Sequence, residues 1–273
     1  MNLIEKFRAY LIAEERADAT VAKYTADAAA FVSWLGERAL DKVAAMEYKA
    51  WLLETHAARS VNTAIAALNR FFDFINRADC RLKAERIQAQ TFADDERELT
   101  EAEYKRLLNA AKGNDRLYHM LMTFAGTGIR VSELQYITVE AAKAREAVVK
   151  NKGKTRTILI EGALAKKLLK YAKTHGIKSG AIFITRTGKP LNRTSIWREM
   201  KSLCKKANVS DKKVFPHNFR HLFARMFYAV EKNLVKLASV LGHSNINTTK
   251  IYTLESEKSH RSVLRKMAMR LTT

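Results

Sequence analysis

Apolar residues recur at helical spacing in four successive segments of the first 78 residues. These segments cover residues 3–15, 19–35, 43–55 and 60–76. In the last of them one face carries Ile65, Leu68, Phe72 and Ile75. Because a surface helix buries one apolar stripe, four such helices predict a small bundle. The aromatic residues Phe71, Phe72 and Phe74 are interpreted as core, with stacking on nucleic-acid bases as the alternative.

Residues that start and stop helices support these boundaries. Asp18 and Ser60 precede the second and fourth segments and can cap them, and Gly36 ends the second. Later in the chain, Thr100 and Glu103 have the spacing of a capping box. A new helix is therefore predicted directly after residue 99.

The stretch between the fourth helix and that capping box is polar and poorly periodic, with an acidic cluster at residues 94–98. Such composition is typical of an extended linker. The sequence thus predicts a first domain over residues 1–84, a linker over 85–98 and a second domain over 99–273.

The second domain is also predicted to be mainly helical. Around residues 148–160, β-branched residues flank a Lys/Asn/Gly turn, which predicts a β-hairpin with a basic tip. A short strand is possible at 181–184. The expected helices cover residues 117–124, 130–137, 162–174, 194–207, 217–230, 234–241, 246–253 and 258–270. The predicted fold class is mainly α with a small β-hairpin.

Charge is distributed very unevenly over the 273 residues. The net charge is +21, yet residues 1–84 carry only +1 and residues 85–98 carry −3. Residues 99–273 hold 35 Lys/Arg against 12 Asp/Glu, a net of +23. A nucleic acid is the usual partner of such a segment because its binding releases counterions. A ribosome-associated or simply very soluble protein is the alternative.

Several other classes are disfavoured. The two cysteines, Cys80 and Cys204, have no ligand spacing, which argues against a zinc site or a disulfide framework. The amphipathic N-terminus with its acidic residues is not a secretory signal, and no apolar run could span a membrane. A cytoplasmic (bacterial) or nuclear setting, with no membrane partner, is expected.

Candidate functional residues are scattered along the second domain. Arg130 follows a Gly-Thr-Gly turn in GTGIRVSEL, and Glu133 lies one helical turn further on. His217 and Arg220 in PHNFRHLFA share a helical face after Pro216. Arginine binds phosphate through a planar fork that stays charged. Alone, an arginine after a glycine turn is more often a solvated surface residue, and Glu133 could simply pair with it there. His217 and Arg220 alone are equally typical of a capping histidine and an exposed arginine.

The remaining candidates are a lysine, a histidine and a tyrosine. Lys152 or Lys154 in the hairpin tip could reach a leaving oxygen, although such tips are often merely solvated. His243 follows Gly242 in LGHSNINTTKIYT, and Tyr252 lies nine residues later. Free tyrosine has a pKa of about 10, so it needs neighbouring cations to act as a nucleophile. Together, these residue types form a set for attack on a phosphodiester without a metal.

These motifs resemble those of the tyrosine recombinase (phage integrase) family. GTGIRVSEL, KGKTR, PHNFRHLFA and LGHSNINTTKIYT follow in the family's order across nearly the whole chain. The resemblance is to the short Xer-like type, with a SAM-like four-helix core-binding domain and no arm-binding domain. It implies a site-specific recombinase that needs no cofactor or metal.

The resemblance also implies individual roles. Tyr252 would form a 3′-phosphotyrosyl bond, and Arg130 and Arg220 would clamp the scissile phosphate. Lys152 would protonate the 5′-oxygen; it aligns better than Lys154, although the hairpin is slightly short for the family. The other implied roles are proton transfer by His217, a phosphate contact by His243 and support of the first arginine by Glu133.

The same resemblance implies a tetramer on two double-stranded DNA sites with inverted repeats, acting through a Holliday junction. A C-terminal helix at about 256–271 carries Val263, Leu264, Met267 and Leu271 as an apolar stripe. It would dock on a neighbouring protomer or pack on its own domain. A type IB topoisomerase and a non-catalytic DNA-binding protein on the same scaffold are the alternatives. Neither the target site nor any accessory protein can be read from the sequence.

Overall fold

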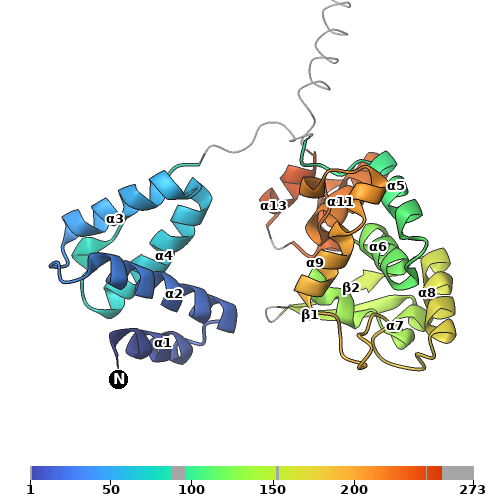
Figure 1. The fold of residues 1–273 in the computed structure, drawn as a ribbon, viewed down its shortest axis with the longest axis horizontal. Coiled ribbons are helices and arrows are strands. Elements are labelled where there is room, and N and C mark those ends of the chain that lie inside the picture. Colours follow the sequence, from blue (N-terminus) through green and yellow to red (C-terminus); the bar gives the residue numbers. More distant parts are fainter. Residues whose placement is uncertain (1, 88–95, 152–153, 244, 254–273) are drawn as a thin grey trace, which may run out of the picture. The chain divides into compact units, whose positions relative to one another are not determined.

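The computed structural model describes residues 2–87, 96–151, 154–243 and 245–253. The chain divides into two compact units, Met1–Ala89 and Gln90–Thr273. The described part is mainly helical with one two-stranded antiparallel sheet, which confirms the predicted fold class (Figure 1). The boundaries of linker and domains at residues 84 and 98 stay predictions.

Four α-helices and a 3-10 turn at Ala78–Cys80 build the described part of the first unit, and their core is aromatic. Phe31 meets Phe72 edge-on with ring centroids 5.4 Å apart, and Phe7 meets Phe71 in the same way at 5.2 Å. All four rings are at most 1% exposed, so the interpretation of Phe71 and Phe72 as core is confirmed. The helices are α1 (Leu3–Ala13), α2 (Asp18–Leu35), α3 (Lys42–Thr55) and α4 (Ala58–Phe74).

Two of the predicted helix caps are wrong. Asp18 is already the first residue of α2, and Ser60 lies inside the first turn of α4. The capping positions belong to Ala17 and Ala57, whose carbonyls accept the first bonds of each helix without a side-chain cap. Each helix therefore begins earlier than its polar residue suggests. Gly36 does end α2, with φ of 60°.

An extended segment at residues 81–87 lies against α4. Asn62 and Asn69, two turns apart on one helix face, each bind its backbone at two points. Asn62 accepts from the Glu85 amide at 2.7 Å and donates to the Glu85 carbonyl at 2.9 Å. Asn69 does the same with Leu82. The start of the predicted linker is thus docked on the first unit, and residues 88–95 lie outside the described residues.

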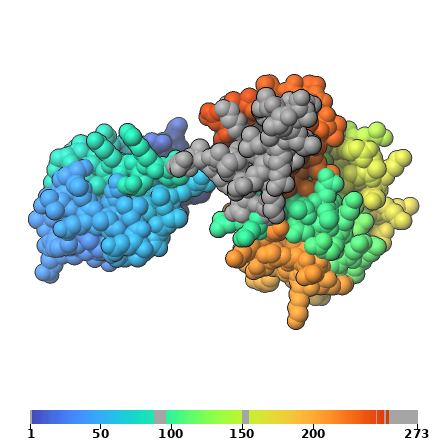
Figure 2. Space-filling model, turned by 90° about the horizontal axis from the view of Figure 1, so that it is seen from above, coloured from blue at the N-terminus to red at the C-terminus, as the bar shows by residue number. Residues whose placement is uncertain are grey.

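The second unit contains an apolar core that is larger than the core of the first unit. Helix α6 packs against both α8 and α11, so segments from the start of this unit and from its last third lie together (Figures 1 and 2). Its elements are α5 (Glu101–Ala111), α6 (Asp115–Thr127), α7 (Val139–Ala144), β1 (Glu146–Asn151), β2 (Lys154–Leu159), α8 (Gly162–Thr174), α9 (Arg193–Lys201), α10 (Cys204–Ala207), α11 (Pro216–Glu231), α12 (Leu234–Leu241) and α13 (Asn247–Lys250).

Most of the second unit agrees with the sequence pattern. The capping box of Thr100 and Glu103 is present, and the hairpin forms with Val149 opposite Arg156. The expected strand at 181–184 is reduced to isolated bridges, one of them to Pro190, which has no N–H to extend a ladder.

Other segments are shorter or tighter than expected. Residues 131–136 and 251–253 form 3-10 turns rather than α-helix, and the helix expected at 194–207 is divided into α9 and α10. The helix expected at 258–270 lies outside the described residues.

Candidate active site

A glycine turn brings the end of α6 against α11. Gly128 ends α6 in the left-handed region with φ of 61°, which favours glycine. A Cβ atom added there would lie 2.4 Å from Cδ1 of Phe223 in α11, so the position also requires the absence of a side chain. The carbonyl of Gly128 is then free to accept a hydrogen bond from Arg220 Nη1 at 2.6 Å.

Arg130 and Glu133 form a tight local pair two residues further on. The carboxylate accepts from the Arg130 amide and from its Nη1 atom, each at 2.8 Å. Burial alone would raise the pKa of Glu133, which is 1% exposed. The Arg130 amide and the guanidinium groups of Arg156 and Arg130 reverse this and hold that pKa below its ordinary value. Glu133 is thus a buried anion that orients Arg130, whose side chain stays 33% exposed.

Helix α11 presents the second arginine. Arg220 is 1% exposed and binds the carbonyls of Gly128 and Leu241, the latter through Nη2 at 2.7 Å. Burial, followed by the charge of Arg130, lowers the pKa of Arg220 to about 10. The guanidinium therefore stays charged at neutral pH. Its neighbour on the same helix face, His217, has a pKa lowered by burial and then by Arg220.

His243 follows α12 and binds two partners. Its Nε2 atom lies 2.9 Å from Nη2 of Arg220, and its Nδ1 atom lies 2.8 Å from Oγ1 of the buried Thr249. Since a guanidinium can only donate, Nε2 must accept and Nδ1 carries the proton. Burial, then Arg220, lowers the pKa of His243 to about 4, which keeps this imidazole neutral.

Tyr252 completes the cluster from the 3-10 turn at the end of the described chain. Its ring stacks on His243, with centroids 5.9 Å apart, and meets His221 edge-on at 4.6 Å. Its side chain also interacts with the Arg220 guanidinium. Tyr252 is 4% exposed, so it is more buried than a lone surface tyrosine would be.

The structure therefore brings together five of the six residues that the sequence singled out as catalytic, and Glu133 with them. Arg130 lies close enough to Arg220 to lower the pKa of Arg220, and His217, His243 and Tyr252 all interact with the Arg220 guanidinium. Lys152 lies outside the described residues, and nothing is described of the Lys154 side chain. The choice between these two lysines stays a prediction.

Three residues of the cluster were not singled out by the sequence. Arg156 bonds Glu133, Thr249 bonds His243, and His221 contacts both His217 and Tyr252. The sequence contains a signal for Arg156. It lies two and four residues before Ile158 and Ile160, which are buried, and alternate residues of a strand share one face. Neither of the others departs from an ordinary helical pattern.

Comparisons with known proteins agree with this arrangement. Residues 97–259 match the phage integrase family, and residues 4–79 match the phage integrase N-terminal SAM-like domain. The chain belongs to the phage integrase family. The first match covers more than half of the chain and includes every residue of the cluster.

The relatives and structural neighbours of this family member include recombinases and integrases. The tyrosine recombinase XerA of Thermococcus kodakarensis is 29% identical over 92% of this chain and 90% of its own length. XerC of Roseiflexus castenholzii is 30% identical over 94% and 90%. A lambda integrase dimer bound to a COC′ core site has a TM-score of 0.74 over 92% of this chain and 93% of the integrase. At 16% identity, the last of these shows the fold alone.

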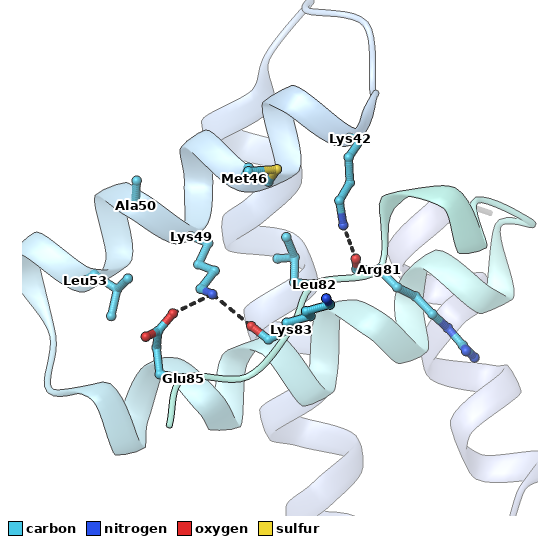
Figure 3. A pocket seen from close by; sticks show the side chains of 9 residues that line it. All are labelled: Lys42, Met46, Lys49, Ala50, Leu53, Arg81, Leu82, Lys83 and Glu85. Atoms are coloured by element: carbon cyan, nitrogen blue, oxygen red, sulfur yellow. Dashed lines mark hydrogen bonds and ion pairs between the residues drawn. The ribbon is translucent and has the colours of Figure 1, made fainter. Parts of the chain in front are cut away.

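The first unit has a groove of its own (Figure 3). It has a volume of about 520 Å³ and an apolar floor that includes Met46 and Leu82. Two of the lysines that line it already bind main-chain carbonyls: Lys42 binds that of Arg81, and Lys49 binds that of Lys83. Among the described residues, no helix is both long and apolar enough to cross a membrane, and no group of three or more metal-binding side chains occurs.

Proposed function

We propose that this phage integrase family member is a site-specific DNA recombinase that cleaves and rejoins strands through a 3′-phosphotyrosyl intermediate and a Holliday junction. The observation that carries the proposal is the packing of Tyr252 against His243 beside the buried Arg220 guanidinium. A tyrosine surrounded by cations and neutral imidazoles is suited to attack a phosphate.

In the first step, the Tyr252 hydroxyl oxygen attacks the scissile phosphorus. The bond between phosphorus and the 5′-oxygen breaks, and the phosphate stays on the 3′-strand as a tyrosine ester. Arg130 and Arg220 balance the charge that develops on the non-bridging oxygens, since two fixed guanidinium groups need no reorganisation during the reaction.

Proton transfers accompany this step. His217, kept neutral by burial, accepts the phenolic proton, while the hairpin lysine, Lys152, gives a proton to the departing 5′-oxygen. To contact a phosphate oxygen, His243 carries its ring proton on Nε2 instead of Nδ1, and the Nε2 bond to Arg220 is exchanged for one to the phosphate. Glu133 holds Arg130. Reversal of the step by a 5′-hydroxyl from another strand rejoins the DNA, so neither ATP nor a metal is needed.

The rest of the chain supports this chemistry. Residues 1–84 would bind the core site, 85–98 would connect the two domains around double-stranded DNA, and 99–273 would carry the catalysis. The +23 charge of residues 99–273 supports a DNA partner. Four copies, joined by the segment at about 256–271, would act together as a tetramer. They would act on nucleoid DNA in the cytoplasm.

The test uses a nicked duplex that carries a candidate site, an inverted repeat to be sought in the DNA that flanks the gene. The wild-type protein should form an adduct with DNA that survives SDS, and Tyr252→Phe should bind the duplex without forming it. An adduct in Tyr252→Phe would contradict the assignment of the nucleophile. Exchange between two sites supports recombination, whereas relaxation of any supercoiled plasmid would support a topoisomerase.

A further inference from the structure

Arg156 connects three parts of the active site. It lies in β2 with a side chain that is 14% exposed. Its Nη2 atom donates to Oε2 of Glu133 at 2.5 Å, and its Nη1 atom donates to the carbonyl of Val240 at 2.7 Å. One planar fork therefore joins the hairpin to the carboxylate behind Arg130 and to the C-terminal end of α12.

The end of α12 is shaped around this side chain. Gly242 adopts φ of 66°, and a Cβ atom added there would lie 2.4 Å from Cδ of Arg156. The backbone just before His243 thus rests directly on the Arg156 stem. The Arg156 fork also binds the Val240 carbonyl. Two contacts of Arg156, one with Val240 and one with Gly242, therefore fix the backbone that leads to His243.

The carboxylate of Glu133 is divided between two arginines. Oε1 binds Nη1 of Arg130, while Oε2 binds the Arg130 amide and Nη2 of Arg156. Without Arg156, the Oε2 atom would keep only the amide, and the carboxylate could rotate. Arg130 would then lose the fixed partner that orients its guanidinium group.

We propose that Arg156 is a positioning residue for the recombination reaction. Through Glu133 it sets the orientation of Arg130, and through the end of α12 it sets the place of His243. Arg156 acts on the reaction through these two residues and does not contact the DNA. The inference rests on the proposed function, in which Arg130 and His243 both contact the scissile phosphate.

The test variant is Arg156→Lys, because lysine keeps the positive charge but cannot bridge Glu133 and Val240 at once. Arg116 offers a matched control in the same unit. It makes the same kind of fork, to the Ile184 carbonyl at 3.0 Å and to Glu199 at 2.7 Å, outside the cluster. Arg116→Lys thus controls for the general loss of a bridging arginine.

Single-turnover cleavage at saturating DNA gives the first readout. Arg156→Lys should cleave roughly 10–100-fold more slowly with an unchanged Kd for DNA, since small misplacements of catalytic groups cost about that much. Arg116→Lys should cleave at the wild-type rate. Equal rates for Arg156→Lys and wild type would overturn the proposal.

A double-mutant cycle with Glu133→Gln separates positioning from folding. If Arg156 acts through Glu133, the double variant should be about as slow as the slower single variant. Losses that multiply would show that the two residues act independently, which overturns the route through Arg130.

NMR of the histidine N–H protons tests the role of Arg156 without DNA, so its result does not depend on whether the protein recombines DNA. The Nδ1–H signal of His243 should be present in wild type and in Arg116→Lys, and shifted or broadened in Arg156→Lys. If wild type forms no adduct, the recombinase proposal fails while this readout still decides on Arg156. An unchanged His243 signal in Arg156→Lys overturns the inference.

Discussion

His243 accepts a hydrogen bond from Arg220, with 2.9 Å between Nε2 and Nη2. Contacts within the protein thus hold the second arginine and the histidine in place. The same Arg220 fork holds the carbonyls of Gly128 and Leu241, at the ends of two helices. Preorganised donors of this kind are effective in catalysis because they do not have to reorient when charge develops.

Thr249 should be needed for the orientation of His243. Thr249→Val keeps the shape of the side chain but removes the oxygen that accepts from Nδ1, which leaves a buried N–H unpaired at a cost of about 1–3 kcal/mol. We expect roughly tenfold slower cleavage with unchanged DNA affinity. Thr249→Ser restores the hydroxyl and should restore most of the rate. Equal defects in both variants would show that packing, not the hydrogen bond, matters here.

The two arginines should differ in what their loss affects. Arg220→Lys removes a fork that serves two buried carbonyls and the His243 ring, so we expect a loss of about 3 kcal/mol of unfolding free energy together with the loss of cleavage. Arg130→Lys retains a charge beside Glu133 at a partly exposed position. It should abolish cleavage at a stability cost of under about 1 kcal/mol. Urea unfolding and adduct formation measure the two effects, and a fully stable Arg220→Lys would refute this distinction.

Much of the fold and of the site could be predicted from the sequence, because local patterns specify them. The apolar stripe of α4 and the hairpin were found from periodicity, and the cluster was found from residue types and motif order. The predicted caps at Asp18 and Ser60 were wrong because the first turn of a helix also accepts polar residues, and the helix dipole stabilises an acidic residue such as Asp18 there. Only the packed helices reveal whether such a residue caps the helix or lies inside its first turn.

The contacts that order the site could not be predicted from local patterns. Arg156 and Glu133 are 23 residues apart in sequence, and Arg156 and Val240 are 84 apart. Which carbonyl a buried arginine binds depends on how α12 packs against the hairpin. No spacing rule within one segment contains that information, even though an arginine among buried isoleucines signals that some partner must exist.

Stability should fall as the pH is lowered below neutral. Burial, followed by His217 and Arg220, lowers the pKa of His221 to about 4, and His243 has a similarly lowered value. Between pH 6.5 and 4 the unfolded chain binds more protons at these histidines than the folded chain, so unfolding is favoured as the pH falls. The Tm should drop by about 2–4 °C for each kcal/mol lost.

His221→Asn provides the comparison for this pH effect, since asparagine does not titrate. Its Tm should fall less than that of wild type between pH 7.5 and 5, when both are followed by circular dichroism. A parallel fall in the two proteins would exclude His221 from the effect.

Gly128 should tolerate no side chain, for two separate reasons. Its φ of 61° is strained for alanine by about 1–2 kcal/mol, and the added Cβ would overlap the Phe223 ring. We expect Gly128→Ala to lower the free energy of unfolding by about 2–4 kcal/mol and to slow cleavage, because the Gly128 carbonyl that Arg220 binds would shift. Gly176 isolates the backbone effect, since it has φ of 69° and no atom within 4 Å of the added Cβ. Gly176→Ala should lose only about 1 kcal/mol in urea unfolding and keep the wild-type cleavage rate. If both variants lost the same stability, contact with Phe223 would not be the reason for glycine at position 128.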